Sequence, residues 1–153
     1  NGNLITKINT TFGNTFILNY NSENKISNYV IQSSGNTETF TETYQNSLLK
    51  QLENNTNTEK TIFYYDSNNR VNKTEYFENS FLTTTFYEYD ANGNVKQNND
   101  DYSTFQFTYD TFNNPFKNVF PQMDAEIFWP WFGSLINNQI LVKEKLNSNI
   151  NSI

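Results

Sequence analysis

The sequence contains no cysteine and no histidine. The missing cysteine excludes disulfide bonds and thiolate sites. The missing histidine excludes Ser-His-Asp and Cys-His catalysis, and both absences exclude zinc sites built from these residue types. We therefore predict no catalytic residues, no metal site and no cofactor, and expect that the protein is not an enzyme. A hydrolase that uses two carboxylates roughly 5–10 Å apart is the enzymatic alternative, but the spacing of the acids nominates no pair.

Basic residues are also scarce. Lysine and arginine total 10 against 16 acidic residues, the net charge is −6, and Arg70 is the single arginine. Binding to a nucleic-acid backbone needs a cluster of basic side chains, so we expect no nucleic-acid partner and no attraction to anionic membranes. The sequence also lacks an apolar run of about 18 residues, so it predicts no transmembrane helix.

Aromatic residues are abundant, although hydrophobic residues as a whole make up only 35% of the chain. Such a low hydrophobic fraction favours disorder, but disordered chains are poor in tyrosine and phenylalanine. This chain has 10 tyrosines and 14 phenylalanines, and each can bury roughly 150–250 Å². At 153 residues we expect one folded domain whose interior is aromatic rather than aliphatic.

A strand–turn–strand pattern recurs along the chain, with spacings of 24, 21, 24 and 20 residues between equivalent tyrosines. Spacings of this size are typical of a repeated supersecondary unit. Residues two and four positions before each tyrosine are mostly apolar, and the residues between them are mostly polar. This alternation is typical of a half-buried antiparallel strand. The five tyrosines are Tyr20, Tyr44, Tyr65, Tyr89 and Tyr109.

Turn residues follow most of these tyrosines. The next residue is Asn or Asp, whose short side chain can bond the backbone of the bend. Three residues later comes Asn or Gly, which tolerates positive φ. This combination predicts hairpin turns. The unit of Tyr44 lacks both signals, so we predict a shorter turn there. The pairs are Asn21 and Asn24, Asp66 and Asn69, Asp90 and Gly93, and Asp110 and Asn113.

Three of these segments resemble known repeats. YYDSNNRV, YEYDANGNV and FTYDTFNNPF resemble the YD-type repeats of RHS proteins and the repeats of secreted lipoproteins of unknown function from Gram-negative bacteria. In that lipoprotein family a porin-like curved antiparallel meander precedes an NNPF motif and a helical segment, and Asn113–Phe116 matches that motif. The resemblance covers residues 1–120. It implies a fold and a location in the periplasm or at the cell surface, and it supplies no catalytic residue.

The patterns together predict an all-β fold. We expect an antiparallel up-and-down meander of about ten strands, either a curved sheet or a partly closed barrel. Residues 1–114 form its hairpin repeats, interrupted by a flexible loop at 32–38. Residues 115–142 are expected to form an aromatic-rich helical or irregular cap, and residues 143–153 a loose tail.

Two groups of residues are candidate sites for ligand binding. Trp129, Trp131 and Phe132 either stack on a sugar ring or plug the aromatic face of the sheet. Glu42 occupies a position that is apolar in the other repeat units. It is either a functional carboxylate in a concave groove or the mark of an irregular or edge strand.

The aspartates Asp66, Asp90 and Asp110 lie at equivalent turn positions of successive hairpins. Equivalent points of successive hairpins are roughly 10 Å apart. We therefore expect each aspartate to stabilise its own turn rather than share an ion with the others.

These observations predict a non-enzymatic structural or interaction protein of the cell envelope. It is expected to be secreted, or anchored through a lipid on a region outside this chain, and its partner is an unknown envelope protein or glycan. The alternative is a carbohydrate- or small-molecule-binding protein that uses an aromatic concave face and the cluster around Trp129 and Trp131.

Overall fold

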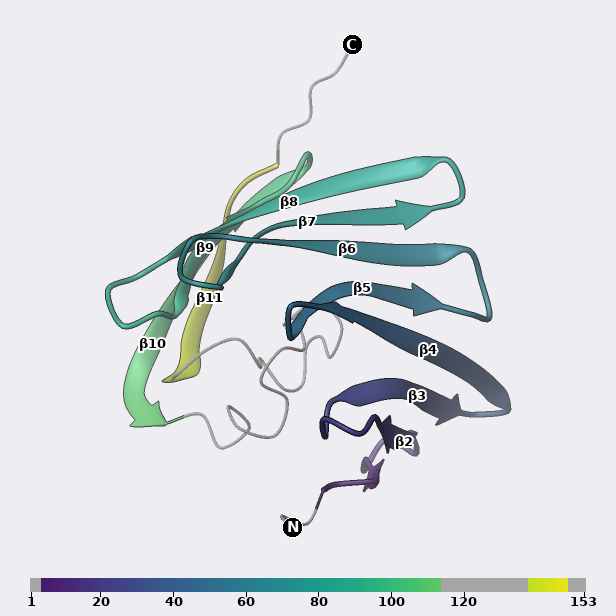
Figure 1. The fold of residues 1–153 in the computed structure, drawn as a ribbon. Coiled ribbons are helices and arrows are strands. Elements are labelled where there is room, and N and C mark those ends of the chain that lie inside the picture. The colour runs from purple at the N-terminus through teal and green to yellow at the C-terminus, as the bar shows by residue number, and fades with distance from the viewer. Residues whose placement is uncertain (1–3, 114–137, 149–153) are drawn as a thin grey trace. The chain divides into compact units, whose positions relative to one another are not determined.

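The fold is a meander of β-strands, seen in a computed structural model that describes residues 4–113 and 138–148 (Figure 1). These residues contain no helix, and none of their segments has the length and apolar character of a membrane-spanning helix. The strands are β1 (Lys7–Asn9), β2 (Thr15–Tyr20), β3 (Ile26–Ser33), β4 (Asn36–Gln45), β5 (Leu48–Asn54), β6 (Glu59–Tyr65), β7 (Val71–Glu78), β8 (Phe81–Tyr89), β9 (Val95–Asn99), β10 (Ser103–Asn113) and β11 (Asn138–Ser148).

The order of the strands confirms the predicted up-and-down antiparallel meander. Sequence order and spatial order coincide from β1 to β11. From β1 to β10 this follows from the short connections, because short turns join neighbouring antiparallel strands. The chain divides into two compact units. One unit holds residues 1–63 and 75–82, and the other holds residues 64–74 and 83–153.

One predicted loop is instead part of two longer strands. The segment 32–38 is rich in Ser, Gly and Asn, but β3 continues to Ser33 and β4 begins at Asn36. Ser33 and Asn36 face each other across the strands, so Ser34 and Gly35 alone make the turn. Their φ angles are 36° and 91°, and positive φ at both central residues suits a tight two-residue hairpin.

The inner face of the strands follows the repeat. Of the five residues two positions before the repeat tyrosines, Phe107 is half-buried and the other four, Leu18, Glu42, Phe63 and Tyr87, are at most 7% exposed. The buried apolar side chains are nevertheless more often aliphatic than aromatic in the described residues, which corrects the expected aromatic interior. Three of the nine are aromatic, and the nine are Leu18, Ile26, Tyr29, Leu49, Leu52, Phe63, Val71, Tyr87 and Val95.

The C-terminal part of the chain differs from the sequence prediction. Residues 138–148 form β11 instead of the end of a cap and the start of a loose tail. Phe107 of β10 lies opposite Lys143 of β11, so β11 supplies partners for backbone groups that β10 would otherwise leave open. The rest of the expected cap, residues 115–137, lies outside the described residues, as do residues 149–153.

Candidate site around Glu42

The hairpin turns use one repeated arrangement of hydrogen bonds. In the turn after β2, the Asn21 side-chain oxygen accepts the backbone N–H groups of Glu23 (2.9 Å) and Lys25 (3.0 Å). Asp66 and Asp90 do the same for the residues two and four positions further on. Each aspartate therefore stabilises its own turn, as predicted, whereas the side chain of Asp110 lies outside the described residues.

Positive φ occurs at three of the four positions that the repeat predicted, three residues after the turn acceptor. The fourth predicted turn, at Asp110 and Asn113, is wrong, because β10 continues to Asn113 and pairs with β11 there. The φ angles are 61° at Asn24, 59° at Asn69 and 80° at Gly93. The turn between β1 and β2 belongs to the same class but was missed. There Thr10 Oγ1 accepts the Asn14 N–H (3.1 Å), and Gly13 has a φ of 82°. The signal was a glycine three residues after a hydroxyl, with threonine in place of aspartate.

The repeat tyrosines hold neighbouring strands together. The hydroxyl of Tyr89 donates to the Val71 carbonyl at 2.7 Å, and that of Tyr109 donates to the Val95 carbonyl at 2.6 Å. Tyr20 donates to the carbonyl of Ile5 at 2.6 Å. We call these three bonds the tyrosine clamps. Val71 and Val95 are the first residues of β7 and β9, so two of the clamps fasten a strand to the start of its neighbour.

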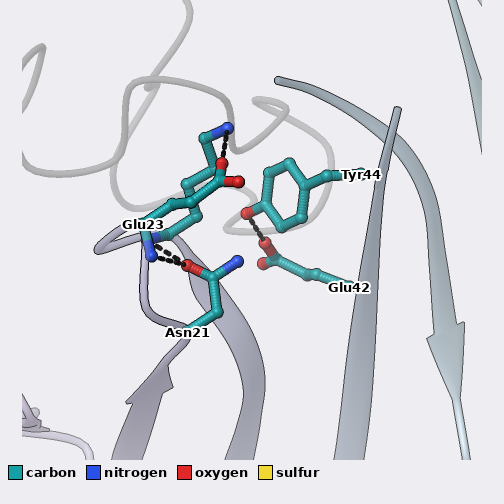
Figure 2. A network of polar contacts seen from close by, with 5 residues as sticks. Asn21, Glu23, Glu42 and Tyr44 are labelled. Atoms are coloured by element: carbon teal, nitrogen blue, oxygen red, sulfur yellow. Dashed lines mark hydrogen bonds and ion pairs between the residues drawn. The ribbon is translucent and has the colours of Figure 1, made fainter. Parts of the chain in front are cut away.

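Tyr44 departs from this arrangement, because its hydroxyl donates to Oε2 of Glu42 (Figure 2). The turn after Tyr44 is also the shortest type, as predicted. β4 ends at Gln45 and β5 begins at Leu48, which leaves Asn46 and Ser47 with φ angles of 50° and 67°. The unit that lacks the usual turn residues is thus the unit in which the tyrosine bonds a side chain.

Glu42 lies in the interior of the strand order. It faces Leu52 across the β4–β5 pair, and β4 lies between β3 and β5. The suggestion of an edge strand is therefore wrong, because the pattern of one strand does not reveal its neighbours. The suggestion of an irregular strand is confirmed, since the register of β4 against β5 shifts between Thr43 and Tyr44.

The carboxyl group of Glu42 is poorly solvated. Its residue is 7% exposed, and its Oε1 atom is buried with no hydrogen-bond partner among the residues that the structure describes. Burial raises the pKa of Glu42 to about 7, although the hydrogen bond from Tyr44 lowers it in part. A carboxylic acid that is half neutral near pH 7 can both donate and accept hydrogen bonds.

The charge of this carboxyl group affects the pKa values of two other tyrosines. Burial and then the charge of Glu42 raise the pKa of Tyr20. Burial raises the pKa of Tyr29 well above its ordinary value, and the charges of Glu42 and Glu38 raise it further. The Tyr29 ring also stacks on Phe40 of β4, with centroids 4.7 Å apart.

The turn between β2 and β3 faces the same place (Figure 2). The side chains of Asn21, Glu42 and Tyr44 point toward one another there. Lys25 pairs with Glu23 at 2.7 Å, and its ammonium nitrogen lies 5.3 Å from the centroid of the Tyr44 ring. A turn and a strand thus bring an amide, a phenol and a carboxyl group together, and we call these three side chains the Glu42 site.

A second polar network was not foreseen from the sequence. The buried amide of Asn54 donates to Glu38 Oε2 (3.2 Å) and to Glu59 Oε2 (3.3 Å). Burial and then the charges of Glu59 and Glu78 raise the pKa of Tyr76 to about 12. An amide and a phenol thus separate carboxylates that would otherwise repel one another.

The remaining candidate residues cannot be placed. Trp129, Trp131 and Phe132 lie outside the described residues. Within 4–113 and 138–148 there is no group of three or more His, Cys, Asp or Glu side chains suited to hold a metal ion. Of the ligand-binding candidates predicted from the sequence, Glu42 lies within the described residues.

The sequence matches no family model, and a search of curated proteins finds no significant relative.

Proposed function

We propose that this protein is a non-enzymatic structural or interaction module of a bacterial cell envelope. The observation that carries the proposal is the commitment of its polar side chains to the backbone. Asn21, Asp66 and Asp90 bond the backbone of their own turns. The tyrosine clamps fasten strands to their neighbours. Polar side chains that bond the backbone stabilise the sheet and are not available for catalysis. Such a sheet is suited to present a surface to a partner.

The resemblance of the repeats to those of secreted Gram-negative lipoproteins supports the location. Exposed aromatic side chains support the interaction role, because large apolar groups on a surface mark contact sites. Phe86 is 53% exposed on β8, where Tyr87 turns inward and Glu88 turns outward. The partner is an envelope protein or a glycan.

Cell fractionation with site-specific photo-crosslinking tests this proposal. The protein, tagged in the bacterium that encodes it, carries a photoreactive amino acid at Phe86 or, as a matched control, at the exposed loop residue Asn57. We expect the protein in the envelope fraction and a discrete adduct from position 86 that position 57 does not give. A cytosolic protein without adducts would contradict the proposal.

A second candidate function is the binding of a carbohydrate or another small polyhydroxyl ligand. It is favoured by the Glu42 site, where an amide, a phenol and a carboxyl group converge (Figure 2). Hydroxyl groups both donate and accept hydrogen bonds, so a sugar hydroxyl could pair with Glu42 Oε1. The aromatic group Trp129, Trp131 and Phe132 would supply a stacking surface in this hypothesis.

Tryptophan fluorescence separates the two candidate functions. Acrylamide quenching is measured with and without a panel of envelope glycans, for the parent protein and for Glu42→Leu. A glycan that protects the tryptophans of the parent, and protects those of the variant less, supports the binding function. Fluorescence that every glycan leaves unchanged favours the structural function.

A further inference from the structure

Glu42 lies close to the turn end of the β4–β5 hairpin, where the pairing of the two strands is irregular. Only Thr43, Tyr44 and Gln45 separate it from the two-residue turn of Asn46 and Ser47. Both turn residues have positive φ, as a tight two-residue hairpin requires, and this conformation is unfavourable for the side chain of Ser47. The register shift between Thr43 and Tyr44 weakens the ladder at the same end, because a bulge leaves one residue unpaired.

The burial of Glu42 conflicts with its ionisation. A carboxylate needs partners for both oxygens, and water cannot reach a buried Oε1 in the packed hairpin. The described residues offer that atom no hydrogen bond. The apolar Leu52 lies directly opposite Glu42 on β5. Opening the hairpin end and admitting water is therefore the change that stabilises a charge at this position at the smallest cost in free energy.

We propose that Glu42 is a proton-operated latch on the β4–β5 hairpin. The neutral carboxyl group packs against Leu52 and shares a hydrogen bond with the Tyr44 hydroxyl. The carboxylate favours a locally opened form, in which the segment from Glu42 to Leu52 separates and the charge becomes hydrated. The latch concerns the ligand-free protein and does not rest on the proposed function.

Among the described residues, no cationic side chain pairs with the Glu42 carboxyl group. From β2 and β3 come Tyr20 and Tyr29, whose pKa values are raised by burial and then by the charge of Glu42. From β4 comes Tyr44, while the acid Glu38 of the same strand acts on Tyr29. The β2–β3 turn contributes Glu23 and Lys25, which pair with each other at 2.7 Å. From β5 the residue opposite is Leu52.

The size of the effect follows from the linkage between protonation and opening. The opened form has the ordinary pKa of 4.5 and the closed form a pKa of about 7. Because the closed form holds its proton more tightly, it is favoured below pH 4.5 and loses this advantage as the pH rises through 7. The equilibrium constant for opening is then expected to rise about 30-fold between pH 5.5 and pH 8.5.

Amide hydrogen exchange at several pH values tests the latch. Protection factors, corrected for the pH dependence of intrinsic exchange, are measured for the amides between Glu42 and Leu52 and for reference amides in β10. We expect the hairpin amides to lose protection by about 30-fold from pH 5.5 to pH 8.5, while the β10 amides change little. Glu42→Gln should abolish this pH dependence, and Glu53→Gln, at an exposed acid of β5, should retain it.

Several outcomes would overturn the proposal. Hairpin protection that does not depend on pH would show that Glu42 ionises without opening the strands. Equal losses in the hairpin and in β10 would indicate global unfolding rather than a local latch. If Glu42→Gln does not fold, the comparison between hairpin and reference amides in the parent protein still decides between these outcomes.

Discussion

Removing the Tyr89 hydroxyl group is the sharpest test of the tyrosine clamps. In Tyr89→Phe the ring stays, and with it the cation–π contact to Arg70, whose guanidinium carbon lies 4.6 Å from the ring centroid. What disappears is the 2.7 Å hydrogen bond to the Val71 carbonyl. The substitution therefore isolates one repeated interaction from the packing of the ring.

The expected loss follows from the surroundings of this bond. A hydrogen bond within a protein contributes about 0.5–1.5 kcal/mol net, and more when its loss leaves a buried group unsatisfied. Val71 is only 3% exposed, and the bond is partly buried. We expect Tyr89→Phe to lower the free energy of unfolding by about 1 kcal/mol, or about 2–4 °C in melting temperature for a chain of this size.

The other clamps supply an internal ranking. Tyr109→Phe removes a partly buried bond to Val95 and should cost about as much as Tyr89→Phe. Tyr20→Phe removes a bond to Ile5 that is exposed to solvent, where water can replace the lost hydroxyl group. We therefore expect its cost to be the smallest of the three.

Urea denaturation followed by circular dichroism measures these differences, provided that the m-value is unchanged. A Tyr89→Phe variant as stable as the parent would show that the Val71 carbonyl needs no donor. A larger loss for Tyr20→Phe than for Tyr89→Phe would refute the argument from burial. Either result would remove the clamps from the account of how the repeat is held together.

Three further predictions concern charge, turns and the core. Hydrogen bonds and the charge of Arg70 outweigh burial and hold the pKa of Asp66 below its ordinary value, so Asp66→Asn should destabilise at pH 7. That deficit should vanish as the pH falls through this pKa, as denaturation at several pH values will show. Gly13→Ala should cost about 1–2 kcal/mol at its positive φ, whereas Asn24→Gly should cost nothing; thermal melts compare them. Glu42→Leu should stabilise the protein at pH 8.5, with the gain shrinking by about 2 kcal/mol at pH 5.5 in urea titrations.

The strands could be located from the sequence because their signals are local. Thr15–Tyr20 was predicted with the bounds that β2 has in the structure, since alternation and a turn signal lie within a few residues of each other. The same local logic failed at Ser34 and Gly35, where small polar residues indicate a loop but the backbone makes a two-residue turn. Composition alone does not distinguish these outcomes.

Partners distant in sequence could not be foreseen. Period-two alternation placed Glu42 on the inner row, but its burial depends on β3 and β5, and no pattern within β4 reveals those neighbours. β11 is a similar case. Its apolar run of Ile140, Leu141 and Val142 is too short to distinguish a strand from a helix, and its partner strand β10 lies far away in the sequence.

The unit of Tyr44 differs from the three units whose tyrosines form the clamps. In the units of Tyr20, Tyr89 and Tyr109 the hydroxyl bonds a backbone carbonyl, which keeps the same charge at every pH. In the unit of Tyr44 the acceptor is the carboxyl group of Glu42, whose charge changes near pH 7. Three clamps should therefore hold equally well across the neutral range, while the contact at Tyr44 depends on a proton. This departure from the pattern thus places a pH-sensitive contact in the β4–β5 hairpin.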